Sequence, residues 1–170
     1  MSRAFLNEDK FEQAGDELME RPVSPHPNYV TPAGLKQLQD AALRLEALRN
    51  QLMAKRDDPF AMQEKAEAER DLRYYVARLE SAIVVDPATQ PENEVRFGAS
   101  VSLEDENGDL HHYAIVGEDE ADVAQNRVSW ASPLAKALIG HRIGEVVKWR
   151  RPAGDMELEI TAIHYQKEPL

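Results

Sequence analysis

The sequence contains no cysteine, few aromatic residues and no long apolar run. Without cysteine, the chain can form neither a disulfide framework nor a thiolate metal site. No apolar run approaches the ~20 residues that a membrane span needs, and no apolar signal segment follows a basic start. Disulfide-stapled and membrane-spanning classes are therefore excluded, and we expect a soluble, cytoplasmic, monomeric protein that does not associate with membranes.

Signatures of the common enzyme classes are also missing. There is no glycine-rich phosphate loop, no nucleophile elbow and no kinase or zinc-protease motif. The five histidines show no metal-binding spacing, since the adjacent His111 and His112 would point to opposite faces of a strand. The acidic run Gly117–Asp122 lacks the spacing of a calcium loop, so we predict a solvated acidic loop there. We expect no cofactor and no metal site of the chain's own.

The charge balance narrows the choice of partner. Asp and Glu number 31 against 20 Lys and Arg, which gives a net charge of −11. Such a charge opposes sequence-independent binding to duplex nucleic acid or to an anionic membrane. A protein or a cation is the favoured partner, although local basic patches can still meet nucleic acid.

Composition changes along the chain. Between Thr31 and Ser81, Ala, Leu and charged residues dominate, whereas Gly, Val and Ile recur from Val95 onward. A helical part followed by a strand-rich part is therefore predicted, which makes the fold class α+β. The expected divisions are an acidic, proline-containing tail at 1–30, a helical hairpin at 31–83, a linker at 84–94 and a C-terminal β domain at 95–165. A short docking helix is an alternative for the tail, with apolar residues Phe5, Leu6, Phe11 and Leu18.

The hairpin prediction depends on a capped start and two apolar seams. Thr31 can cap a helix whose first residue is Pro32. Apolar residues then recur at three-four spacing, which predicts two helices that fold back as an antiparallel coiled coil. The predicted seam positions are Leu35, Leu38, Ala42, Leu45, Leu48 and Leu52, then Met62, Ala66, Leu72, Val76, Leu79 and Ile83, with Lys65 and Glu69 as weaker positions.

The stretch KRDDPFAM, residues 55 to 62, joins the two helices and has two interpretations. Asp57 and Asp58 can form an acidic tip that completes the coordination of a Mg²⁺ held elsewhere, since Mg²⁺ commonly takes one or two protein carboxylates. Alternatively, the stretch is a turn in which Asp58 caps a helix that starts at Pro59. The turn explains Asp58 fully and Asp57 adequately.

Basic residues on the hairpin also have two interpretations. Acidic side chains are interleaved with them, which is typical of a solvated helix surface with i to i+4 pairs. A stripe that faces RNA or DNA is the alternative. Its members would be Arg49, Arg56, Arg70 and Arg73.

Beyond Val95, several segments alternate apolar and polar residues as half-buried strands do. Asn107-Gly108 between two of them predicts a hairpin. The run SPLAKALIG, Ser132 to Gly140, predicts one short helix with Ser132 as cap and Pro133 in the first turn. We expect a small, mostly antiparallel sheet with one helix against it.

The order of these motifs resembles the bacterial transcript-cleavage (Gre) factor family, GreA/GreB-like. The matching elements are the Thr-Pro-x-Gly helix start, the hairpin, VVDP, FGASVSLED, IVGEDEAD, SPLAKALIG and GEVV. The resemblance implies a coiled coil followed by an FKBP-like domain. It also implies a partner, RNA polymerase, whose secondary channel the coiled coil enters. Family members with an acidic tip help the polymerase's own active site to hold a second Mg²⁺, so the resemblance implies no enzyme active site here.

Two departures from the family pattern bear on function. Ser132 and Pro133 match the polymerase-binding helix start, but Ala131 stands where Asp is expected. The tip has no Gly-Asp-x-x-Glu-Asn run, and each arm is shorter by about one heptad, or about 10 Å. The tip is therefore expected to stop short of the catalytic metal.

Three functions follow from these residues. The preferred one is a polymerase-binding regulator of elongation with weak or no stimulation of transcript cleavage. The second is a true cleavage factor that uses Asp57 and Asp58, sharing the polymerase's Mg²⁺. The third is an FKBP-like interaction module whose partner is not RNA polymerase.

Overall fold

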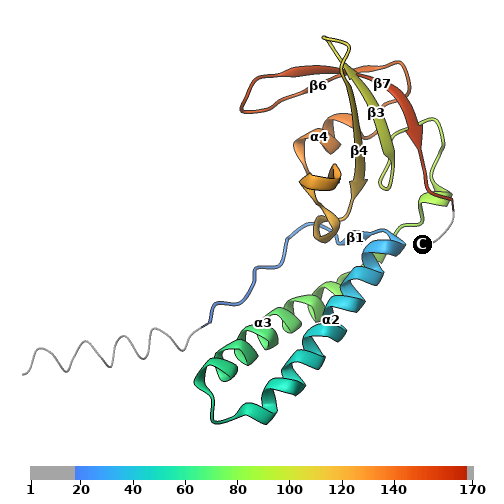
Figure 1. Ribbon diagram of the computed structural model, residues 1–170. Helices are drawn as coiled ribbons and strands as arrows, with labels where there is room; N and C mark the ends of the chain where they lie inside the picture. The colour runs from blue at the N-terminus through green and yellow to red at the C-terminus, as the bar shows by residue number, and fades with distance from the viewer. Residues whose placement is uncertain (1–17, 168–170) are drawn as a thin grey trace, which may run out of the picture. The chain divides into compact units, whose positions relative to one another are not determined.

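The computed structural model describes residues 18–167, and the fold divides into two compact units (Figure 1). Among the described residues, one unit comprises 18–24 and Asp40–Arg78, and the other comprises Pro25–Gln39 and 79–167. None of the described helices is long and apolar enough to cross a membrane. Phe5, Leu6 and Phe11, proposed above for a docking helix, lie outside the described residues.

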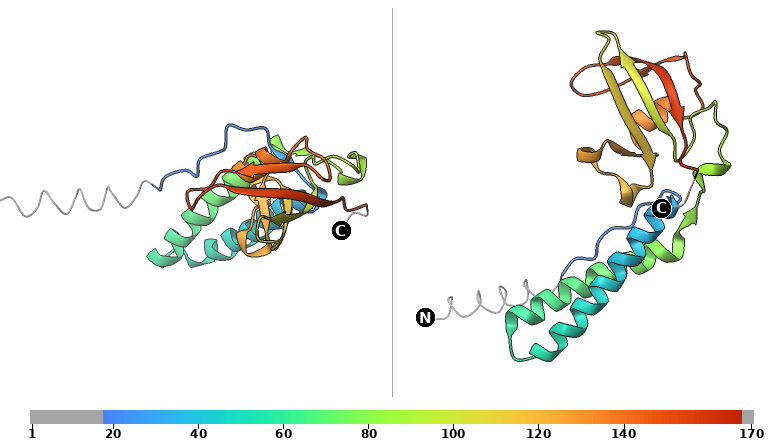
Figure 2. Two further views of the ribbon diagram at one scale, coloured as in Figure 1. Left: turned by 90° about the horizontal axis from the view of Figure 1, so that it is seen from above. Right: turned by 45° about the vertical axis from the view of Figure 1, so that its right-hand side comes forward.

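Two antiparallel helices form most of the first unit, as the coiled-coil prediction requires (Figure 2). Helix α2 spans Pro32–Leu52, a 3₁₀ turn η1 spans Met53–Lys55, and helix α3 spans Pro59–Ser81. Thr31 caps α2 as predicted, because its Oγ1 accepts a hydrogen bond from Gly34 N at 3.0 Å. The predicted capped start and hairpin are confirmed.

The predicted seam of α3 is right at Leu72 and Leu79 and wrong at Ala66 and Val76. Ala61, Ala68 and Arg78 are the buried residues of this helix, whereas Ala66, Val76 and Ile83 are exposed. Buried or half-buried positions recur at 61, 65, 68, 72, 75 and 79, so this spacing shares Leu72 and Leu79 with the predicted seam and differs from its other main positions by one residue. Apolar character misled the prediction, because Lys and Arg bury long aliphatic stems while their charged ends find polar partners.

A five-stranded sheet forms the second unit, in the order β5-β4-β3-β7-β6. All neighbours are antiparallel except β4 and β5, which run parallel. The strands are β3 Ser100–Asp105, β4 Leu110–Val116, β5 Arg127–Ser129, β6 Val146–Trp149 and β7 Met156–His164. The predicted α+β class, with a mostly antiparallel β domain, is confirmed.

The core of this unit lies between the sheet and one short helix, α4, Pro133–Leu138 (Figure 1). Leu134, Ala135 and Leu138 of α4 are buried against strand residues such as Leu103 and Ile160. The predicted hairpin turn is present between β3 and β4. There Gly108 has φ +80°, in the left-handed region that glycine tolerates, and Gly108 N donates to Asp105 O at 3.0 Å.

The end of the predicted tail and the predicted linker are both folded. Strand β1, Tyr29–Val30, pairs in parallel with β2, Ile83–Val84. Asn28 and Val30 are buried. A 3₁₀ turn, η2 Pro87–Thr89, follows, with Asp86 as its cap. Proline content predicted an extended tail and a linker, but backbone pairing between residues more than 50 positions apart leaves no local signal.

Candidate functional site

The hairpin turn is built around Asp58. Its Oδ1 accepts a hydrogen bond from Phe60 N at 2.9 Å, and its carbonyl accepts one from Met62 N at 3.0 Å. Pro59, at the first helical position, has no N–H to leave unsatisfied. The cap predicted for Asp58 is therefore confirmed, and one carboxylate of the tip is engaged with its own backbone.

Other side chains at the turn face solvent. Arg56 and Asp57 are exposed, and the ring of Phe60 is 82% exposed. Among residues 18–167, no group of three or more His, Cys, Asp or Glu side chains is arranged to hold a metal ion. The tip thus presents one outward carboxylate, one capping carboxylate and an aromatic ring.

We expect Asp58→Ala to lower the free energy of unfolding by about 1 kcal/mol, because the first turn of α3 loses its side-chain cap. Asp57→Ala removes the neighbouring charge without removing a cap and serves as the matched control. Urea unfolding followed by far-ultraviolet circular dichroism measures both variants. Equal effects from the two would contradict the assignment of Asp58 as the cap.

The start of α4 shows the predicted geometry. Ser132 Oγ accepts a hydrogen bond from Ala135 N at 3.3 Å, and Ser132 O accepts one from Lys136 N at 3.0 Å. Pro133 occupies the first helical position and is exposed, while Ala131 and Ser132 are partly exposed. The three predicted polymerase-binding residues thus lie together at one exposed helix start.

An aromatic cluster lies immediately before this helix start. The Trp130 ring makes edge contacts with Tyr29, at 5.1 Å between centroids, and with His26, at 5.8 Å. Tyr29 also packs on Phe97, at 6.0 Å. Residues 26–29, predicted to be tail, therefore belong to the structure that supports the α4 start. The aromatic residues were visible in the sequence, but nothing local indicated that they would meet.

Glu120 is the residue that the sequence interpretation missed. The prediction of a solvated loop at Gly117–Asp122 is wrong for this residue, which is 7% exposed within the 3₁₀ turn η3, Glu118–Glu120. Its Oε2 accepts hydrogen bonds from the backbone N–H groups of Thr31 and Gly117, each at 3.1 Å, and Thr31 Oγ1 donates to Oε1. Burial is tolerated because the carboxylate is satisfied by three donors. Glu120 therefore ties the first residues of α2 to the β domain.

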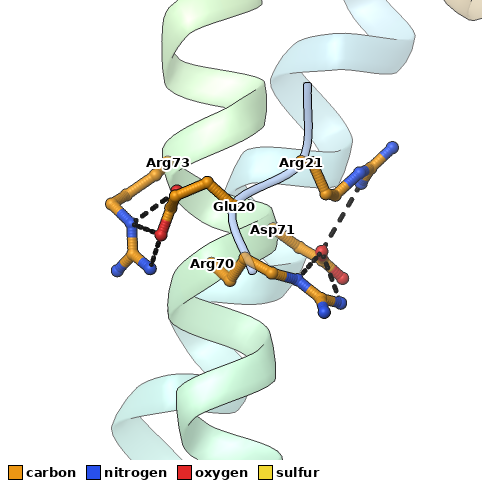
Figure 3. Close-up of polar contacts among 5 residues, drawn as sticks. All are labelled: Glu20, Arg21, Arg70, Asp71 and Arg73. Carbon is orange, nitrogen blue, oxygen red and sulfur yellow. Dashed lines mark hydrogen bonds and ion pairs between the residues drawn. The ribbon is translucent and has the colours of Figure 1, made fainter. Parts of the chain in front are cut away.

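Two of the four basic candidates, Arg70 and Arg73, are paired with carboxylates (Figure 3). On α3, Arg70 pairs with Asp71 at 3.1 Å, and Arg73 pairs with Glu20 of the N-terminal segment at 2.5 Å. On α2, Arg49 lies 3.8 Å from Glu46. Arg56 lies at the tip. The structure thus engages Arg70 and Arg73 with carboxylates, although neither pair has the i to i+4 spacing that the helix-surface interpretation expected.

Comparison with known proteins decides the family. Residues 90–165 match the family model described as "Transcription elongation factor, GreA/GreB, C-term". The chain is 36% identical over 155 residues to transcription elongation factor GreB of Neisseria meningitidis serogroup B, covering 82% of this chain and 95% of that protein. The chain belongs to the GreA/GreB family of transcription elongation factors.

Further relatives agree with this assignment. Transcription elongation factor GreA of Psychrobacter is 34% identical over 154 residues, covering 85% of this chain and 98% of that protein. Among solved structures, GreA factor homolog 1 (Gfh1) of Thermus thermophilus is 30% identical and covers 82% of this chain and 99% of its own, with a TM-score of 0.40. The GreA/GreB assignment depends on the sequence relatives. The predicted family is therefore confirmed, while the roles of individual residues stay predictions.

Proposed function

We propose that this GreA/GreB-family factor binds RNA polymerase at the secondary channel and regulates elongation with weak or no stimulation of transcript cleavage. Family membership supports the polymerase as partner. The exposed start of α4, with Ala131, Ser132 and Pro133, supports a docking surface there, and the helical hairpin supplies an arm. The chain has no active site of its own in this proposal. It acts on the active site of the polymerase.

The geometry of the hairpin tip supports the proposal that this factor stimulates transcript cleavage weakly or not at all. Asp58 uses a carboxylate oxygen to cap α3, so turning that carboxylate toward an external Mg²⁺ would remove the cap. Asp57 is the exposed tip carboxylate that can turn toward an external ion without loss of this cap. The resemblance to the family pattern also implies an arm that is shorter by about one heptad, or about 10 Å. Since Mg²⁺ bonds are about 2 Å long, a rotamer change cannot cover that deficit.

These residues do not fit the metal-sharing role, and we derive no hydrolytic step through them. Contact with RNA or DNA inside the polymerase is proposed for Arg56, which is exposed beside the tip. Arg70 and Arg73 would first have to leave Asp71 and Glu20. In this role the factor occupies the channel and competes with cleavage factors for it.

A backtracked elongation complex tests the proposal. Adding the purified protein is expected to leave the rate of transcript shortening near its factor-free value, with no further loss in Asp57→Ala/Asp58→Ala. Adding it beside an active cleavage factor is expected to slow shortening in proportion to occupancy. Strong stimulation that disappears in the double variant would instead establish the chain as a true cleavage factor.

Binding to core polymerase is measured separately. Pro133→Ala is expected to weaken binding by up to about tenfold, because the α4 start loses its fixed backbone and an exposed apolar contact. Pro152→Ala, an exposed proline elsewhere in the same unit, is the matched control, and Asp57→Ala should bind normally. Undiminished binding by Pro133→Ala would remove α4 from the interface. Absence of binding at low salt would favour a partner other than polymerase.

A further inference from the structure

The chain segment Leu18–Ser24 makes side-chain contacts with the outer face of α3 (Figure 3). The Glu20 carboxylate accepts hydrogen bonds from Arg73, with each oxygen 3.1 Å from Nε and Oε1 2.5 Å from Nη2. The next residue, Arg21, places its guanidinium carbon 3.9 Å from the centre of the Tyr74 ring and Nη1 3.6 Å from Asp71 Oδ1. Two successive residues thus contact one helix, with Glu20 on the side of Arg73 and Arg21 on the side of Asp71.

These contacts define a register. The acid of the segment meets a base of α3, and the base of the segment meets an acid of α3. A shift by one residue would place Glu20 near Asp71 or Arg21 near Arg73, so one pairing would become a repulsion and the other would be lost. The arrangement therefore selects an acidic residue followed by a basic one, with the aromatic ring of Tyr74 under the basic side chain.

The contacts are also exposed to solvent. Glu20 and Arg73 side chains are 60% and 56% exposed, and Met19 is 84% exposed. Charge pairing and the stacking of Arg21 on Tyr74 therefore outweigh apolar burial in holding the segment. Exposed pairs are weak and are screened by salt, with a Debye length of about 10 Å at 0.1 M that falls to about 3 Å at 1 M. Attachment of this kind is reversible.

We propose that the α3 face formed by Arg70, Asp71, Arg73 and Tyr74 is a peptide-docking surface that recognises a Glu-Arg pair in an extended segment. The chain's own segment Leu18–Ser24 occupies this surface as a strap, and rising ionic strength opens it. The closed strap covers Tyr74 and engages Arg73. The surface becomes accessible only when the strap leaves.

Ionic strength, and not pH, is the controlling variable near neutrality. The hydrogen bond from Arg73 holds the pKa of Glu20 below its usual value, with Arg70 adding a smaller charge effect. A lowered carboxyl pKa means that the pairing is present above the ordinary value of 4.5 and is lost only as pH falls through the lowered pKa. The strap is therefore expected to stay closed from pH 6 to 8 at low salt.

Spin labels can measure the strap directly, because the natural chain has no cysteine. Met19→Cys and Gln63→Cys place labels on the strap and on exposed α3, and the second site lies about 15 Å along the helix from Arg73. In the full-length chain at low salt, double electron–electron resonance is expected to give a narrow distance distribution. As NaCl is raised to 1 M, the fraction of molecules with a broad distance distribution, in which the strap is detached, should grow severalfold.

Charge variants distinguish loss of the contact between Glu20 and Arg73 from a general effect of changing the charge of the helices. Arg73→Glu is expected to give the broad distribution even at low salt, and Glu20→Arg/Arg73→Glu is expected to restore the narrow one. Arg44→Glu makes the same charge change at an exposed position of α2 and should leave the distribution narrow. The proposal would be overturned if the distance distribution changed neither with salt nor in Arg73→Glu. It would also be overturned if Glu20→Arg/Arg73→Glu failed to restore the narrow distribution. Neither result depends on polymerase binding.

Discussion

Replacing Glu120 by alanine is expected to lower the free energy of unfolding by about 3 kcal/mol. The buried carboxylate accepts hydrogen bonds from Thr31 N and Gly117 N and from the Thr31 hydroxyl. Truncation leaves these donors without an acceptor in a region that is shielded from water. Such orphaned groups cost their full desolvation penalty, and the removed side chain adds a small cavity.

Tryptophan fluorescence suits this measurement, since Trp130 and Trp149 both lie in the second unit. Urea unfolding of Glu120→Ala should show a lower midpoint with little change in slope. Glu120→Gln keeps one acceptor oxygen and should fall between the alanine variant and the natural chain. Glu106→Ala, an exposed glutamate in the β3–β4 turn, is the control and should unfold normally. A loss below about 1 kcal/mol in Glu120→Ala would show that water replaces the carboxylate.

Gly34→Ala is expected to destabilise the protein by about 2 kcal/mol, opposite in sign to the usual effect of this substitution in a helix. Alanine normally adds about 0.5–1 kcal/mol by reducing the freedom of the unfolded chain. At Gly34, however, a Cβ atom would lie 2.1 Å from Glu120 Cδ and 2.3 Å from Oε2. Because those atoms are held by the Thr31 and Gly117 donors, the carboxylate must leave its hydrogen bonds to make room.

A double-mutant cycle tests the cause of that loss. Once Glu120 is alanine, the space beside Gly34 is empty and a methyl group fits there. Gly34→Ala in the Glu120→Ala background is therefore expected to be neutral or mildly stabilising, so the two losses should not add. Additive losses would locate the strain of Gly34→Ala somewhere other than at Glu120. The same urea titration provides all four free energies.

Features with a local cause could be predicted from the sequence. The caps at Thr31, Asp58 and Ser132 each involve a side chain and a backbone N–H two or three residues away, so the sequence motif contains the whole interaction. The Asn107-Gly108 turn is local in the same sense. These motifs were sufficient to predict both the helical hairpin and the α4 start.

Features with distant partners could not be predicted. Glu120 contacts Thr31 across 89 positions, and Arg73 contacts Glu20 across 53. From sequence, an acidic run is predicted to face solvent, because the distant hydrogen-bond donors that allow one of its side chains to be buried are not known. In α3, Arg78 is 1% exposed while Val76 is 43% exposed, so side-chain polarity misidentified the inward face. Long-range pairing, and not local preference, decided the cases of Glu120 and Arg73.

The parallel pairing of β1 with β2 gives the arm the topology of an insertion. Tyr29 lies opposite Ile83 and Val30 opposite Val84, so the residues between them leave and return at one fixed point of the second unit. Asn28 Nδ2 donates to Ser81 Oγ at 3.2 Å at the same point. Whole heptads can then be added to or removed from both helices without altering either strand, because the facing positions of the coiled coil keep their register.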